Sequence, residues 1–185
     1  MHEANIVLMS QHDITDLLGE TIGAVVLDSG CSETVCGQKW YDCFVDTLPQ
    51  VIKKGLTIQK SSRTFKFGSG KVLPSLMKVS LPCKISGIRV DIVTDVVNSD
   101  IPLLLIKAAM KRAKTHLDFE NDTFVMFGRK QKLNCTPTGH YYIPLAKPLP
   151  SSGNSSEVLF IKEINNKTKG EKLAIATKLQ TVQSP

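Results

Sequence analysis

The hydrophobic positions of the chain fall into short runs, and most of these runs have the length of β-strands. Residues 22–27 are apolar and rich in β-branched side chains, which predicts a strand buried on both faces. Residues 101–105 form a second apolar run. Further short strands are predicted at residues 4–10, 64–67, 72–73, 77–81, 87–90, 92–97, 117–119, 123–127, 130–133 and 140–145.

Two segments have a helical character instead. Residues 107–114 (KAAMKRAK) combine the strongest helix formers of the chain. Residues 39–48 carry Trp40, Tyr41 and Phe44, which we expect in a helix packed on the core. Pro82 and Gly87 are expected to break the strands around them. The fold class predicted is therefore all-β with one or two helices.

The texture of the chain changes after Leu145 and sets the expected domain limits. Residues 146–156 contain Pro148, Pro150, Gly153 and four serines, as a linker does. We predict an N-terminal segment at 1–17, one domain at 18–146 and a linker with a flexible tail at 147–185. The tail is expected to be dispensable for the fold and for any activity. The alternative is that residues 157–164 add a strand to the sheet or cap a dimer.

Composition and charge exclude several classes of protein. Hydrophobic residues make up 42% and charged residues 22%, which is ordinary for a globular domain. No apolar run approaches the roughly 18 residues of a membrane span, so we expect no membrane partner. The formal net charge of +6 divides equally between residues 1–146 and 147–185. A charge this small and this spread out does not favour nucleic acid as a partner.

The cysteines and the start of the chain bear on the compartment. The chain has five cysteines, an odd number, and no basic and apolar leader is visible at Met1. We therefore expect reduced thiols and a cytoplasmic location. The spacing of Cys31, Cys36 and Cys43 lacks the close pairs of a zinc site, so no metal site and no cofactor are predicted.

The most informative motif is Asp28-Ser29-Gly30, which directly follows the apolar strand at residues 22–27. A carboxylate that takes part in hydrolysis needs a rigid strand end, and the small residues after it allow a tight turn with room for a substrate. The alternative is an Asx or Ser/Thr turn without function, because this tripeptide is common in loops.

Two phosphate-related interpretations of the sequence are rejected. Gly68-Ser69-Gly70-Lys71 has some likeness to a P-loop, but Phe65 stands at the first glycine position and Val72 at the final hydroxyl position. A phosphoryl-accepting aspartate at Asp28 would need a second carboxylate nearby for magnesium, and the residues that follow supply none.

Several segments in order, together with Asp28-Ser29-Gly30, resemble the retropepsin-like aspartic proteases, and in particular the protease domain of retrotransposon polyproteins. The resemblance covers residues 18–146. It rests on the following stretches: residues 24–32, 65–70, 95–105, 117–123 and 139–145.

The resemblance implies a closed β-barrel with one short helix near its C-terminal end, and it assigns roles to individual residues. Asp28 would be the catalytic aspartate, and Ser29 and Gly30 would complete the active-site loop. Phe67, Gly68, Ser69 and Gly70 would lie in the flap that closes over a bound peptide, with the flap as a whole at residues 65–72. Residues 103–105 would form the apolar strand beneath the catalytic loop.

Two positions depart from the family pattern. Cys31 replaces the usual alanine after the triplet, and it is small and apolar enough to fit. Ile106 follows the apolar pair of the second motif, where retroviral proteases carry glycine. The larger side chain bears on catalytic competence more than on the fold.

Aspartic proteolysis needs two carboxylates that share one proton, and the chain carries a single Asp-Ser-Gly and no Asp-Thr-Gly. The expectation is therefore a homodimer that places Asp28 of each subunit across a twofold axis. The function predicted is an aspartic endopeptidase that processes a retrotransposon polyprotein as its peptide substrate. The alternative is a catalytically decayed or host-reused dimerisation or peptide-binding module on the same fold.

Overall fold

The computed structural model describes residues 5–7, 18–19, 21–68, 70–148 and 158–161, and it is mostly β. The strands are accompanied by helices α2 (Gln38–Asp46), α3 (Gln50–Lys54) and α4 (Lys107–Arg112). The all-β expectation is confirmed in this coarse form. The helices expected at residues 39–48 and 107–114 are α2 and α4.

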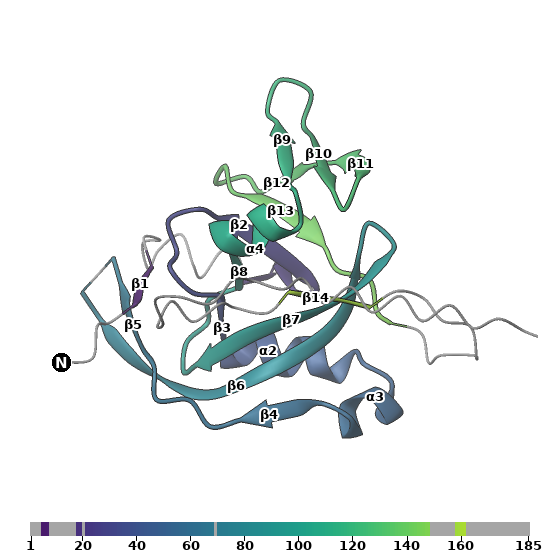
Figure 1. Ribbon diagram of the computed structural model, residues 1–185. Helices are drawn as coiled ribbons and strands as arrows, with labels where there is room; N and C mark the ends of the chain where they lie inside the picture. The colour runs from purple at the N-terminus through teal and green to yellow at the C-terminus, as the bar shows by residue number, and fades with distance from the viewer. Residues whose placement is uncertain (1–4, 8–17, 20, 69, 149–157, 162–185) are drawn as a thin grey trace, which may run out of the picture.

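The framework is a long antiparallel hairpin of β6 (Val72–Ile85) and β7 (Ile88–Val97), which curves along the lower part of the molecule (Figure 1). The two strands pair from Ile85 opposite Ile88 outward, and the register shifts once, between Ser75 and Met77. A shift of this kind bends a strand, so the first residues of β6 diverge from the rest.

The predicted break at Pro82 is wrong, because β6 runs through this residue, which pairs with Asp91 of β7. Proline removes only one N–H donor. A strand tolerates that loss where the missing N–H would not point at a partner strand. The several short strands expected at residues 72–85 are therefore one long strand.

The larger sheet has the order β1-β5-β6-β7-β3-β8-β2-β13-β12, with β4 paired to β6 and β14 paired to β7. The closed barrel that the resemblance implied is not found among the described residues. The path is open as far as the structure describes the chain, because β1 pairs there only with β5 and β12 only with β13. The remaining bounds of this sheet are β1 (Asn5–Val7), β2 (Ala24–Asp28), β3 (Val35–Gly37), β4 (Thr57–Gln59), β5 (Thr64–Phe67), β8 (Leu103–Ile106), β12 (Asn134–Cys135), β13 (Tyr141–Pro144) and β14 (Val158–Ile161).

A second, three-stranded sheet follows α4 and projects from the top of the molecule in Figure 1. It consists of β9 (His116–Asp118), β10 (Thr123–Met126) and β11 (Arg129–Lys132), in the order β11-β10-β9. The three strands match the short strands predicted for this part of the sequence. Phe124 and Met126 of the central strand are buried and join the main core.

Helix α2 packs its aromatic side chains into the core, as the sequence predicts. The rings of Trp40 and Phe44 stack with centroids 5.0 Å apart, and both side chains are buried. The indole Nε1 of Trp40 donates a hydrogen bond of 2.8 Å to the carbonyl oxygen of Thr21. This bond ties the helix to the segment that enters β2, the strand that ends at Asp28.

Gly37 is where the chain passes from β3 into α2, and it is in tight contact with the loop before β8. A Cβ at this position would lie 2.1 Å from the carbonyl oxygen of Ser99 and 2.7 Å from the amide nitrogen of Ile101. The amide of Gly37 donates to the carbonyl oxygen of Ile101 at 2.9 Å. Only glycine allows this approach of two backbones.

The segment beyond Leu145 contains one described strand. Residues 158–161 of β14 pair in parallel with residues 89–92 of β7. This pairing is what the alternative for residues 157–164 expected. The remainder of the predicted linker and tail, at 149–157 and 162–185, lies outside the described residues.

Candidate functional site

Strand β2 delivers Asp28 to the end of a rigid, buried element. Val25 and Val26 are fully buried. The strand is flanked on one side by β8, in parallel, and on the other by β13, in antiparallel pairing. Asp28 is the last residue of the strand and stands opposite Ile106 of β8. The apolar run of the sequence thus places one carboxylate at a fixed position, as predicted.

The two oxygens of the Asp28 carboxylate have different surroundings. Oδ1 accepts hydrogen bonds from the amide nitrogens of Gly30 at 2.9 Å and Cys31 at 3.1 Å. Oδ2 is buried, and among the described residues it has no hydrogen-bond partner. A buried carboxylate oxygen without a partner is uncommon and costly in a folded protein, and a chemical role is one of the explanations for such an atom.

The residues after Asp28 turn outward. Ser29 and Gly30 are exposed, whereas Cys31 is buried and its Sγ donates to the carbonyl oxygen of Glu33 at 2.9 Å. Cys31 therefore occupies its place as a small apolar residue, as the sequence indicates. The Asx-turn alternative is also present in the geometry, because the Oδ1 contacts of Asp28 are those of such a turn.

The hairpin expected at residues 64–73 is formed by β5 and the start of β6, with Phe65 opposite Leu73. At its tip the amide of Phe67 donates to the carbonyl oxygen of Lys71, and the amide of Gly70 donates to the carbonyl oxygen of Phe67. Gly70 has a φ of +81°, which suits glycine.

The residues assigned to the tip differ in exposure. Gly68 and Gly70 are exposed, and Phe67 is buried with 6% of its surface accessible. Phe67 is thus part of the core. Ser69 lies outside the described residues.

A buried polar network that sequence reasoning missed lies beside this hairpin. Asp95 of β7 is fully buried, and its carboxylate accepts hydrogen bonds from Ser61, Ser75 and Arg63. The same Nη1 of Arg63 lies 3.1 Å from Oε2 of Glu33. A signal was present in the sequence, because Asp95 lies in the mainly apolar second half of β7, and a buried charge needs partners.

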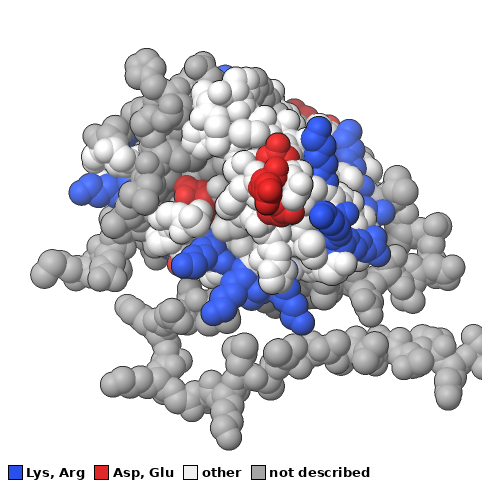
Figure 2. Space-filling view, turned by 90° about the horizontal axis from the view of Figure 1, so that it is seen from above, with Lys and Arg blue, Asp and Glu red and all other residues white. Residues whose placement is uncertain are grey.

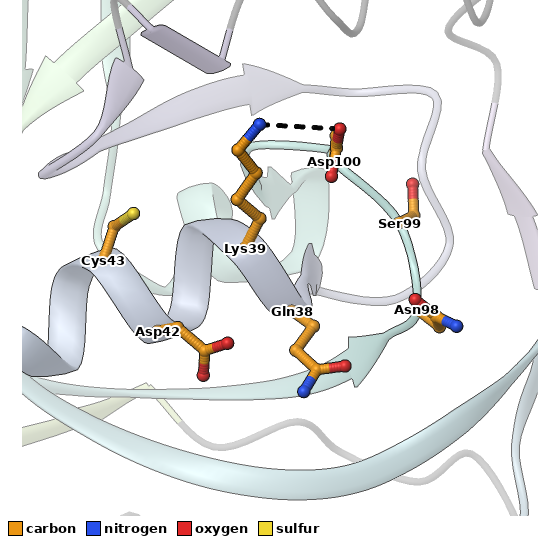
Figure 3. Close-up of a pocket in the computed structure, with 7 residues that line it drawn as sticks. All are labelled: Gln38, Lys39, Asp42, Cys43, Asn98, Ser99 and Asp100. Carbon is orange, nitrogen blue, oxygen red and sulfur yellow. Dashed lines mark ion pairs between the residues drawn. The ribbon is translucent and has the colours of Figure 1, made fainter.

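An open pocket of about 290 Å³ lies between the first turns of α2 and the loop that precedes β8 (Figure 3). Across its rim Lys39 Nζ and Asp100 Oδ2 form an ion pair at 3.7 Å, with both side chains at least half exposed. Pairs of this kind contribute little to stability. Its lining residues do not include Asp28, Ser29 or Gly30.

Charges of both signs share the face that carries the three-stranded sheet. All four residues of β11 (Arg129–Lys132) are exposed, and Figure 2 shows basic side chains on this face around a smaller acidic group. Within the described ranges, no group of three or more His, Cys, Asp or Glu side chains is placed to hold a metal ion. None of the described helices is long and apolar enough to cross a membrane.

Comparisons with known proteins give little beyond this geometry. No protein-family model and no curated protein matches the chain. Among solved structures, the retroviral protease-like domain of Ddi1 from Leishmania major superposes with a TM-score of 0.33 and 12% identity, over 71% of this chain and 86% of that domain. A TM-score and an identity this low do not establish a shared fold or function.

Proposed function

We propose that the protein is an aspartic endopeptidase of the retropepsin type that is active as a homodimer and cleaves a retrotransposon polyprotein. The observation that carries the proposal is the carboxylate of Asp28 at the end of β2, with Oδ1 held by two backbone amides and Oδ2 buried without a partner. The first oxygen is fixed in position, and the second is free to hold or share a proton.

The chemistry follows from pairing two such carboxylates across a dimer axis. Like charges at close range cannot both ionise, so the pair shares one proton. The ionised partner takes a proton from a water molecule, whose oxygen attacks the peptide carbonyl carbon. The protonated partner gives its proton to the carbonyl oxygen. The carboxyl that took the water proton then gives it to the nitrogen, the C–N bond breaks, and the other carboxylate takes a proton back from a hydroxyl of the intermediate. The products are a carboxylic acid and an amine, and the pair again shares one proton. Activity falls as pH rises past the upper apparent pKa of the pair, because the shared proton is lost.

The exposed hairpin tip and the exposed Ser29 fit this proposal. A hairpin with glycines at its tip moves at little cost and closes over a peptide, which excludes water from the reacting bond. Ser29 is exposed in the single chain and is available to a second subunit. Replacing Gly70 with valine should lower kcat/KM, because a φ of +81° is strained for a β-branched residue and the hairpin tip must change its conformation, although no atom lies within 4 Å of the added Cβ.

The experiment is a peptidase assay in the acid range on the protein and on Asp28→Asn, which keeps the shape of the side chain and removes its charge. Asp122→Asn is the matched control, because Asp122 is exposed and its φ of 47° suits asparagine. The proposal expects activity in the protein and in the control and none in Asp28→Asn. Equal activity in all three overturns it.

One observation favours a second function, a dimerisation or peptide-binding module without catalysis. Ile106 is buried with 4% of its surface accessible and stands opposite Asp28, where retroviral proteases carry glycine. This second function predicts that the protein and Asp28→Asn bind the assay peptides with equal affinity and that neither cleaves them.

A further inference from the structure

The carboxylate of Asp95 accepts hydrogen bonds from residues on both sides of the β5–β6 hairpin, at its base. Oδ1 accepts hydrogen bonds from Ser61 Oγ at 2.5 Å and Ser75 Oγ at 2.8 Å, and Oδ2 accepts one from Arg63 Nη1 at 3.1 Å. Ser61 and Arg63 lie within the three residues before β5, and Ser75 belongs to β6. The amide of Ser75 also donates to the carbonyl oxygen of Arg63 at 2.8 Å.

The same network reaches the loop that follows Asp28. Arg63 Nη1 lies 3.1 Å from Glu33 Oε2, and both side chains are about one-fifth exposed. The amide of Asp95 donates to the carbonyl oxygen of Thr34 at 3.1 Å. One guanidinium therefore joins three parts of the chain: the hairpin base, the loop after Asp28 and β7.

The network sits where the hairpin bends away from the framework. The register of β6 on β7 shifts between Ser75 and Met77, directly beside the Asp95 contacts. A charge buried in a sheet costs free energy unless it is fully paired. A protein with apolar residues in place of a buried ion pair is often at least as stable. A role in fixing one arrangement explains why a costly carboxylate stands at this bend.

We propose that Asp95 and Arg63 are positioning residues that anchor the base of the hairpin to the loop that follows Asp28. They set the angle at which the hairpin lies over the site. The link to peptide binding rests on the proposed function, whereas the anchor itself is a property of the chain that is measured without activity.

The first arm of the test is hydrogen exchange on Arg63→Met in the full chain, with Lys60→Met as the matched control, since Lys60 is exposed and lies just before the network. We expect the amides of β5 and of residues 72–76 to exchange about tenfold faster in Arg63→Met, while β2 and β8 keep their protection. The control exchanges like the unaltered protein. Unchanged exchange of the hairpin in Arg63→Met overturns the proposal.

Arg63→Met leaves Asp95 buried without its cation, so general destabilisation must be separated from loss of the anchor. The double variant Arg63→Met/Asp95→Asn removes the unpaired charge and should recover the stability to urea. We expect its hairpin to continue exchanging fast, because no ion pair holds the base. A hairpin that regains its protection together with stability contradicts the anchoring role.

The second arm measures peptide cleavage. Arg63→Met and the double variant should raise KM about tenfold and change kcat less than twofold, and Arg63→Lys should restore much of the loss. If the protein cleaves no peptide, the proposed function fails and the exchange arm still decides on the anchor. If peptide is cleaved and KM is unchanged in both variants, the anchor does not position the site.

Discussion

Asp28 and Ile106 stand opposite each other at the ends of two adjacent parallel strands, β2 and β8. After Asp28 the backbone turns through exposed Ser29 and Gly30, whereas all four residues of β8 are buried. The side chain of Ile106 is buried, so the position of the carboxylate depends on how this apolar neighbour packs.

Shortening Ile106 should therefore destabilise the protein in proportion to the volume removed. We expect Ile106→Val to lower the free energy of unfolding by about 1 kcal/mol and Ile106→Ala by about 2–4 kcal/mol. Urea denaturation measures both. An alanine variant as stable as the unaltered protein would show that Ile106 does not support the end of β2.

Replacing Gly37 with alanine should destabilise the protein by overpacking, because the added Cβ meets backbone atoms. The Cβ of Gly37→Ala would lie 2.1 Å from the carbonyl oxygen of Ser99, and neither segment can move without breaking the Gly37–Ile101 hydrogen bond. We expect a loss of about 3 kcal/mol, at the upper end for overpacking.

Gly55→Ala is the control for this substitution. Its nearest atom, the carbonyl oxygen of Ile52, is 3.6 Å from the added Cβ, and the change should cost less than about 0.5 kcal/mol. Equal melting temperatures for the two variants would refute the tight contact.

Because of its buried thiols, the protein should lose stability as pH rises in the alkaline range. Burial raises the pKa of Cys36 from 9.0 to about 12, and burial also raises the pKa of Cys83. The unfolded chain then loses these protons first, so their contribution to stability is complete below pH 9 and is lost as pH rises toward 12.

This dependence is measured by urea denaturation at pH 8 and pH 10. Replacing Cys36 and Cys83 with valine should make the decline between the two pH values smaller. A variant that declines as steeply as the unaltered protein contradicts the assignment. In the native protein a thiol reagent should modify exposed Cys135 first, and Cys36 and Cys83 only after unfolding.

The strand β14 predicts that part of the chain beyond Ala146 stabilises the domain. Truncation after Ala146 removes the parallel partner of β7 and should lower the melting temperature by several degrees, whereas truncation after Ile161 keeps the strand and should not. Equal melting temperatures for both truncations and the full chain would support the linker and dispensable tail that the composition indicates.

Much of the fold was accessible from the sequence, because local patterns determined it. The apolar run at residues 22–27 gives β2, and the residues around Trp40 and Lys107 give α2 and α4. Pro82 does not end β6, since a proline is compatible with a strand when its position in the ladder needs no donor.

The Asp95 network was not predicted, because its contacts join residues 20 to 34 positions apart. The hydrophobic pattern of the sequence also could not show that the sheet stays open. Whether the sheet closes depends on where β1 and β12 lie in space, which local patterns in the sequence do not determine.

The measurement that tests the central claim most directly mixes the protein with Asp28→Asn at a fixed concentration of unaltered chain. If each site needs Asp28 from two subunits, random exchange with a threefold excess of the variant leaves about one quarter of the original peptidase activity. An equal excess of Asp122→Asn should not lower it. Peptidase activity that the Asp28→Asn excess leaves unchanged, or an unaltered protein that cleaves no peptide, would contradict the account.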